Sequence, residues 1–434
     1  MHNTPHCHGG HRCALSAAIG LGVLLAAAGC ARFTDMATHH ATPAQHAVPV
    51  SAAAVAERET AAPIPLVGVL TGDLHGVDAL LAKLGPRRAY VIGELHDNYA
   101  HHLAQRDVIE ALHADGAPLA IGIEWIQRPF QPVLDDYIAQ RIDEATLLKR
   151  TEYFNRWGFD FRLYRPIFRY AREQQLPLIA LNAAQALSAA VSKQPYEQLP
   201  EAQRAQLPEF RIEVPASYRQ RLQDAFAKHP KPWRGTGGAQ QADRFEGFMR
   251  VQQLWDATMA ETAVDYLNRH PDHRIVVLAG HGHVSWPGAI ADRMKARLPA
   301  TGPAHSPVAS IELRQSPAHP SGYADALLMP ASRALPNAGR LGVRLAQTDH
   351  GVRIQALSAG GAAAHAGLRA GDRLLALDGK QVDTVADVLI LLLDKRPGDN
   401  VRIALRQADA VRTRQVTLMP DPPRHQNPER PNHD

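Results

Sequence analysis

The chain has 434 residues, with 47 Lys and Arg against 43 Asp and Glu, which gives a formal net charge of +4. This slight excess, without any dense basic run, argues against a nucleic-acid-binding protein. A hydrophobic content of 45% and a charged content of 21% are typical of a globular protein rather than a disordered one. The length allows two or three domains.

Residues 1–29 are predicted to be a lipoprotein signal peptide, because an apolar run too short to span a membrane leads into Ala27-Ala28-Gly29-Cys30. This ending resembles a bacterial lipobox, with Ala27 where Leu is usual. Cleavage there removes the two earlier cysteines, and lipidation of Cys30 leaves no free thiol. The alternative is an ordinary signal peptide cut nearby.

The residue after the lipidated cysteine is Ala31, rather than the Asp associated with inner-membrane retention. By analogy, we expect an anchor in the outer membrane that faces the periplasm. Residues 30–64 are rich in Ala, Thr, Pro and His and are predicted to be a flexible tether. At the other end, residues 421–434 are predicted to be a disordered tail.

The first domain is predicted at 65–314, where four short apolar runs each end at a polar residue. Short continuous apolar runs separated by helix-length segments indicate buried parallel strands. The beginning indicates strand, helix, strand at 90–93, 100–113 and 119–123. Residues 185–270 break this alternation and are predicted to form a helical insertion over the sheet, with helices at 199–207, 216–229 and 243–269.

The carboxyl ends of parallel strands meet at one edge of a sheet, where open α/β sheets bind ligands. The polar residues at the ends of the four runs should therefore converge on one crevice: Glu94, His96, Glu124, Asn182, His281 and His283. Asp256, on the last helix of the insertion, could face the same crevice.

A second, smaller domain is predicted at 339–420, after a Pro- and Ser-rich linker at 315–338. The expected elements are a helix at 385–393, a tight turn at Asp378-Gly379, and strands at 352–356, 373–377, 401–406 and 413–418. The predicted fold class is therefore α/β, a mostly parallel sheet with flanking helices and a helical insertion, followed by a small domain of strands with one helix.

The first domain resembles the ChaN-like family of bacterial haem-binding lipoproteins, which shares a superfamily with the Tiki metalloproteases and the erythromycin esterases. The motifs that carry the resemblance span about 250 residues: Gly93-Glu94-Leu95-His96-Asp97-Asn98, Ile123-Glu124-Trp125, Arg156-Trp157-Gly158-Phe159-Asp160, Tyr164-Arg165-Pro166, Trp255-Asp256, and Leu278-Ala279-Gly280-His281-Gly282-His283. The His281 and His283 pair departs from the single histidine common in that family.

The second domain resembles a PDZ domain of the kind attached to bacterial periplasmic proteases, a partly open β-barrel with helices. Arg340-Leu341-Gly342-Val343 fits the loop that binds a peptide carboxylate, and Gly367-Leu368, Gly371-Asp372 and Asp378-Gly379 fit the rest of the pattern. The resemblance implies capture of a partner's C-terminus by strand addition.

The resemblance to haem-binding proteins implies an iron ligand among His, Tyr and Met, since the mature chain offers no free Cys. Tyr164 and Tyr99 are the candidate tyrosinates, each with the alternative of a buried tyrosine that bonds through its hydroxyl. Arg156 and Arg165 are candidates for the haem carboxylates. The remaining candidates for the haem site are His96, His101, His102 and His281. His101 and His102 are adjacent on a helix and point in different directions.

The same crevice also allows a divalent metal site, with ligands drawn from Glu94, His96, Glu124, His281 and His283. In that case the protein would be a metal-dependent hydrolase, with Glu94 or Glu124 as general base. The third hypothesis is a non-catalytic PDZ scaffold. The resemblance favours a haem-binding protein of iron acquisition that is not an enzyme, with haem held by one protomer or between two protomers of a homodimer.

Overall fold

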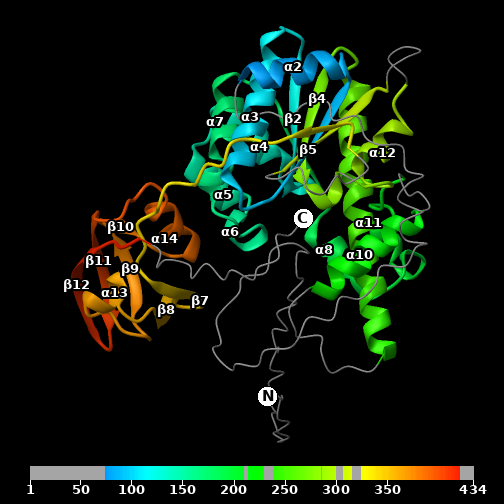
Figure 1. Cartoon of the computed structure of the whole chain (residues 1–434). Coiled ribbons are helices and arrows are strands. Elements are labelled where there is room, and N and C mark those ends of the chain that lie inside the picture. Colours follow the sequence, from blue (N-terminus) through cyan, green and yellow to red (C-terminus); the bar gives the residue numbers. More distant parts are fainter. Residues whose placement is uncertain are drawn as a thin grey trace, which may run out of the picture.

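A computed structural model of the chain describes residues 74–209, 214–228, 238–284, 286–299, 306–314 and 324–420 (Figure 1). The predicted signal peptide, lipidation site, tether and C-terminal tail lie outside the described residues. Within those ranges, no helix combines the length and the apolar character that a membrane span requires.

The first domain is built on a six-stranded sheet with the order β3-β2-β4-β1-β5-β6, in which every neighbouring pair is parallel. Glu94 at the end of β1 is level with Gly280 at the end of β4. The predicted parallel sheet is confirmed. The strands are β1 (Ala89–Glu94), β2 (Leu119–Gln127), β3 (Leu178–Asn182), β4 (Arg274–Gly280), β5 (Val308–Leu313) and β6 (Ala326–Leu328).

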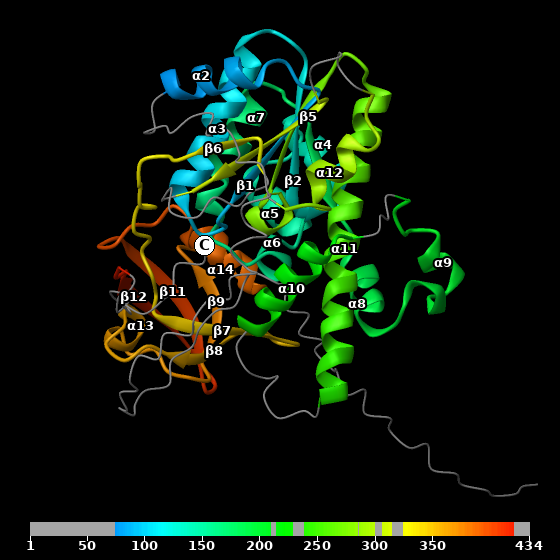
Figure 2. The ribbon, with the colours of Figure 1, turned by 45° about the vertical axis from the view of Figure 1, so that its right-hand side comes forward.

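Helices cover both faces of the sheet, because the strands are apolar and buried almost continuously, so the side chains on either face need cover. One face packs on α2 (Leu74–Leu84), α3 (Tyr99–Ala114), α4 (Gln131–Ile138), α5 (Glu144–Arg150) and α7 (Arg165–Glu173). The other face packs on α11 (Gly238–Arg269) and α12 (Ile290–Lys295), which run together in Figure 2. The short helix α6 (Tyr153–Arg156) links α5 to the segment before α7.

The predicted helical insertion contains α8 (Gln185–Lys193), α9 (Glu201–Arg204) and α10 (Ala216–Lys228). However, α11 is part of the main helical layer rather than of a separate cap. Its residues Ala260, Ala263 and Leu267 are buried against the sheet at helical spacing. Helix α10 packs on α11 through Tyr218 and Leu222.

The strands differ in several places from those expected from the sequence. Strand β2 continues to Gln127, so Glu124 lies inside the strand instead of after it. Strand β6 lies in the stretch predicted to be a linker, and it pairs with β5. The strand β7 (Val343–Thr348) was not predicted, because Arg344 and Gln347 interrupt any apolar run.

The second domain is an antiparallel sheet with the order β12-β11-β9-β8-β7, and β10 pairs with β9. Its elements are β8 (Gly351–Leu357), α13 (Ala362–His365), β9 (Arg373–Leu377), β10 (Lys380–Gln381), α14 (Val385–Leu392), β11 (Asn400–Gln407) and β12 (Ala410–Thr417). Helix α14 begins with a capping box between Thr384 and Asp387. The domain has its own apolar core.

Candidate functional site

Glu94 is the centre of the polar cluster at the carboxyl ends of the strands. Its side chain is fully buried between two imidazoles, with His96 Nδ1 at 2.8 Å from Oε1 and His102 Nδ1 at 2.6 Å from Oε2. Burial raises the pKa of Glu94, but the charge and hydrogen bond of His102, followed by those of His96, lower it to about 2. Glu94 is therefore an anion that holds both rings in place.

His96 reaches from this pair toward the surface. Its side chain is 15% exposed, and its ring contacts Trp157 edge-on at 4.8 Å and Phe159 at 5.2 Å between centroids. Burial lowers the pKa of His96, but the hydrogen bond to Glu94 and the charges of Glu124 and Glu94 outweigh it and raise the pKa. The Nε2 edge lies over Gly280, where a Cβ would be 2.8 Å from Nε2.

A second buried chain of polar groups runs from α10 to the sheet. The Tyr218 hydroxyl donates to Asp256 Oδ2 at 2.7 Å, and Asp256 Oδ1 is 2.6 Å from His283 Nδ1. His283 Nε2 is 3.5 Å from Glu124 Oε1, and the other oxygen of Glu124 accepts from the Gly280 N–H at 2.7 Å. Burial lowers the pKa of His283, but the charge of Asp256 more than offsets this and raises it.

Two further histidines near Glu94 are held neutral. Burial lowers the pKa of His281 to about 4 and that of His101 to about 3. His281 Nδ1 donates to the Glu94 carbonyl at 3.3 Å, so Nε2 carries the lone pair. His101 Nδ1 accepts from the Leu95 N–H at 3.1 Å, which leaves the proton on Nε2.

The sequence-predicted residues do not all meet at this crevice. Glu94, His96, Glu124, His281 and His283 do converge, and His102 joins them through Glu94. Asp256 reaches the site as expected, whereas the Asn182 side chain only accepts from the next residue's N–H. Neither His101 nor His102 faces solvent, since both are fully buried.

The candidate tyrosines and arginines either have other hydrogen-bond and ion-pair partners or lie outside this crevice. Tyr164 is buried, accepts from Trp157 Nε1 at 2.9 Å and donates to the His96 carbonyl at 3.2 Å. Tyr99 lines a separate cavity of about 460 Å³ beside the second domain. Arg156 bonds to Gln127, Gln185 and Glu152, and Arg165 lies between Glu144 and Asp394.

The divalent-metal hypothesis finds no support in the described ranges. There, no group of three or more His, Cys, Asp or Glu side chains is arranged to hold a metal ion. The reason is visible in the pairing, since Glu94 is taken up by His96 and His102, while Glu124 faces the Gly280 N–H and His283.

Comparison with known proteins accounts for the first domain. Residues 80–294 match the family model described as haem-binding uptake, Tiki superfamily, ChaN. The first domain belongs to the ChaN-like haem-binding family. Among solved structures, the chain is similar to the ChaN of Campylobacter jejuni with cofacially bound haem, at 14% identity and a TM-score of 0.42, over 55% of this chain and 86% of that one.

Residues 339–418 match the PDZ domain model. The chain is also similar to a serine endoprotease from Yersinia pestis, at 24% identity and a TM-score of 0.18, over 19% of this chain and 29% of that one. It is also similar to the HtrA-type protease AlgW with a decapeptide, at 19% identity and a TM-score of 0.19, over 22% of this chain and 31% of that one. The chain thus spans about a third of the length of these proteases. The comparison with curated proteins found no match.

Several residues of the site were not assigned a role from the sequence. Trp157 and Phe159 line the crevice. The sequence identified them only as part of a motif that carries the family resemblance. Tyr218 and Arg221 come from α10, which carries no motif. The sequence predicted a helix at 216–229 within the insertion over the sheet, but it gave no residue of this helix a role in the site.

The neutral state of His101 makes the ChaN-like domain sensitive to acid. Its pKa is about 3 in the fold and 6.5 ordinarily, so between these values the unfolded chain binds a proton that the folded chain does not. The free energy of unfolding should therefore fall as the pH decreases from 6.5 toward 3, with His101 contributing up to about 1.4 kcal/mol per pH unit. In His101→Asn, which keeps an acceptor for the Leu95 N–H, denaturant titrations should give a shallower slope. Equal slopes in the two proteins would contradict this assignment.

Proposed function

We propose that this chain is a lipid-anchored haem-binding protein of the bacterial cell envelope that acts in haem and iron acquisition, and that its PDZ domain docks the C-terminus of a partner protein. Membership of the ChaN-like family supports haem as the ligand. The lipobox-like sequence that ends at Cys30 supports the anchor.

The observation that carries the haem site is the state of His96. Histidines that bind a metal usually donate their other ring N–H to a carboxylate, which fixes the tautomer and makes the ligand more basic. His96 has this arrangement, because Glu94 accepts at Nδ1, while Nε2 lies over Gly280 and has no hydrogen bond within the described ranges. We propose that His96 would hold the haem iron when haem is bound.

The surroundings of His96 fit a flat, largely apolar group. Trp157 and Phe159 are both half-buried and flank the ring. Gly280 provides the room, since any Cβ there would meet the His96 ring at 2.7 Å. When bound, haem supplies an iron that accepts one or two axial protein ligands. His281, which is neutral at ordinary pH, is a second imidazole of the crevice.

We do not assign Tyr164 as a ligand of the haem iron. Its hydroxyl is buried and bonded on both sides, so iron binding would break two hydrogen bonds and expose Trp157 Nε1 without an acceptor. Arg156 and Arg165 are each engaged by neighbouring side chains, so we do not assign them to the haem carboxylates.

Haem titration of the chain from Ala31 onward tests the proposal. We expect a saturable Soret band, loss of at least about tenfold in affinity in His96→Ala, and near-unchanged affinity in Tyr164→Phe. Absence of a specific band in the unaltered chain would overturn the haem proposal. Loss of the band in Tyr164→Phe, but not in His96→Ala, would overturn only the choice of ligand.

Gly280 offers a sharper test of the geometry. In Gly280→Ala the new methyl would overlap the His96 ring, so haem affinity should fall several-fold even though no ligand has been removed. The matched control is Gly282→Ala, where the nearest atom is Arg221 Nη1 at 3.5 Å and an added methyl is accommodated. Equal affinities in the two variants would argue against haem at this position.

The anchor is tested separately at Cys30. In the full chain, Cys30→Ser should abolish incorporation of labelled palmitate and move the protein from the membrane fraction to the periplasmic fraction. Absence of the palmitate label in the unaltered chain, with the protein in the periplasmic fraction, would leave an ordinary signal peptide as the better explanation.

A further inference from the structure

The peptide-binding groove of the PDZ domain is formed by β7 and α14. Strand β7 is at the edge of the sheet, with its outer side unpaired in the described chain. At its start, Gly342 has a φ of +70°, which turns the backbone of the carboxylate-binding loop. In the described ranges, the N–H groups of Leu341 and Gly342 have no hydrogen-bond acceptor, as expected of a loop that binds a carboxylate.

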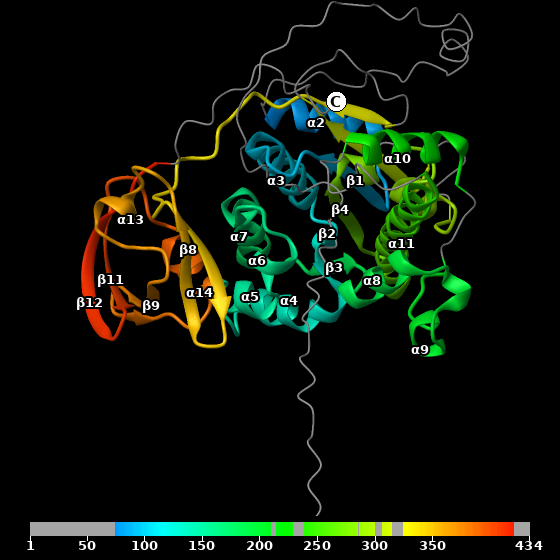
Figure 3. The same cartoon turned by 90° about the horizontal axis from the view of Figure 1, so that it is seen from below.

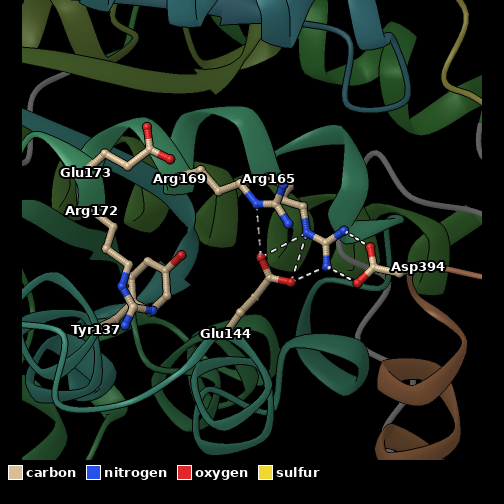
Figure 4. Close-up of a pocket in the computed structure, with 7 residues that line it drawn as sticks. All are labelled: Tyr137, Glu144, Arg165, Arg169, Arg172, Glu173 and Asp394. Carbon is tan, nitrogen blue, oxygen red and sulfur yellow. Dashed lines mark hydrogen bonds and ion pairs between the residues drawn. The ribbon is translucent and has the colours of Figure 1, made fainter.

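The ChaN-like domain contacts the helix that walls this groove. Helix α14 lies beside α5 (Figure 3), and Lys149 of α5 forms an ion pair of 2.5 Å with Asp387. Just beyond the helix, Asp394 pairs with Arg165, which is held from the other side by Glu144 (Figure 4). Ile390 and Leu393 pack against the apolar core of the ChaN-like domain.

The ChaN-like domain also contacts the carboxylate-binding loop. Arg340, the first residue of the loop, has its Nη2 at 3.4 Å from Asp160 Oδ2. Asp160 is held mainly by Arg162, whose Nη2 is at 2.6 Å, and the same arginine bonds to the Pro336 carbonyl in the chain that leads into the PDZ domain. Both sides of the groove are thus engaged by the first domain.

We propose that docking of the PDZ domain on the ChaN-like domain competes with the binding of a protein C-terminus. The partner is a protein whose C-terminal residue is apolar and has a free carboxylate. Its carboxylate takes the place of Asp160 beside Arg340. Its added strand displaces α14 from Lys149 and Arg165. This inference rests on the proposed docking of a C-terminus by the PDZ domain, and it does not depend on haem binding.

The docking contacts are weak enough for a peptide to replace them. Each pair has one exposed partner, since Asp394 has 77% of its side chain exposed and Lys149 has 51%, whereas Arg165 and Asp387 are each 11% exposed. Ion pairs with a solvent-exposed partner contribute little, about 0–1 kcal/mol each in measured cases. A C-terminal peptide adds a run of backbone hydrogen bonds along β7, and these stabilise the complex more than the broken ion pairs stabilised the docked state.

Release of the PDZ domain would also change the surface of the ChaN-like domain. The cavity of about 460 Å³ that contains Tyr99 is lined from both domains, including Leu393 and Asp394 after α14. The segment that holds Asp160 also carries Trp157 and Phe159, which contact His96. A partner C-terminus would thus open one cavity and loosen the segment beside the proposed haem ligand.

Peptide affinity in charge-reversal variants tests the competition. The probe is a fluorescein-labelled decapeptide that ends in Val-Leu-Val with a free carboxylate, and the readout is anisotropy with the chain from Ala31 onward. Lys149→Glu and Asp394→Arg each place like charges across the docking contact and lie outside the groove. Each should tighten peptide binding by about two- to fivefold.

Two variants carry the same charge changes away from the contact. Lys193→Glu lies on α8 of the ChaN-like domain, and Asp409→Arg lies in the exposed turn between β11 and β12. Both should leave the affinity unchanged, and the C-terminal amide of the peptide should bind poorly to every variant. Unchanged or weaker binding in both docking variants, or no binding of the free-acid peptide to any protein, would overturn the proposal. A haem titration on the same samples reports separately on the haem site.

Discussion

The buried carboxylate of Glu94 is the constraint on which the arrangement of the ChaN-like domain depends. An unpaired charge in the interior costs several kcal/mol, so Glu94 requires its two histidines to be in place. His102 is on α3, so its pairing with Glu94 ties that helix to β1. The loop between β1 and α3 is fixed in turn, with Asn98 as the N-cap of α3. The orientation of the His96 ring is fixed by its own hydrogen bond to Glu94.

The second chain of buried groups serves the other side of the crevice. Tyr218, Asp256 and His283 connect α10, α11 and the end of β4 in one line of short hydrogen bonds. Burial and the adjacent Asp256 raise the pKa of Tyr218 well above its ordinary value, so the phenol remains a donor to that carboxylate. Breaking one link would leave a buried acceptor unsatisfied. The helical insertion is thereby held over the sheet by specific polar contacts and not only by apolar packing.

The convergence of Glu94, His96, Glu124, His281 and His283 could be predicted from the sequence, because parallel strands bring the ends of apolar runs to one edge. The sequence could not show how these groups share partners. The capture of Glu94 by His102 depends on the rotation of α3, and Tyr218 arrives from a helix whose position no local pattern specifies. The strand β6 lies in a stretch that the sequence predicts to be a linker, because three residues are too few to show the alternation of a strand.

The contact between the two domains is the part least visible in the sequence. Lys149, Arg165 and Asp394 resemble ordinary surface charges, and only their spatial pairing gives them a role. Charged, exposed pairs make an interface that is specific in register but weak in energy. Such an interface suits a module that must be both positioned and released. An apolar contact of similar extent would hold the PDZ domain permanently and leave its groove blocked. The use of charges at α14, with Leu393 as one of few apolar contacts, therefore favours a reversible dock over a fixed one.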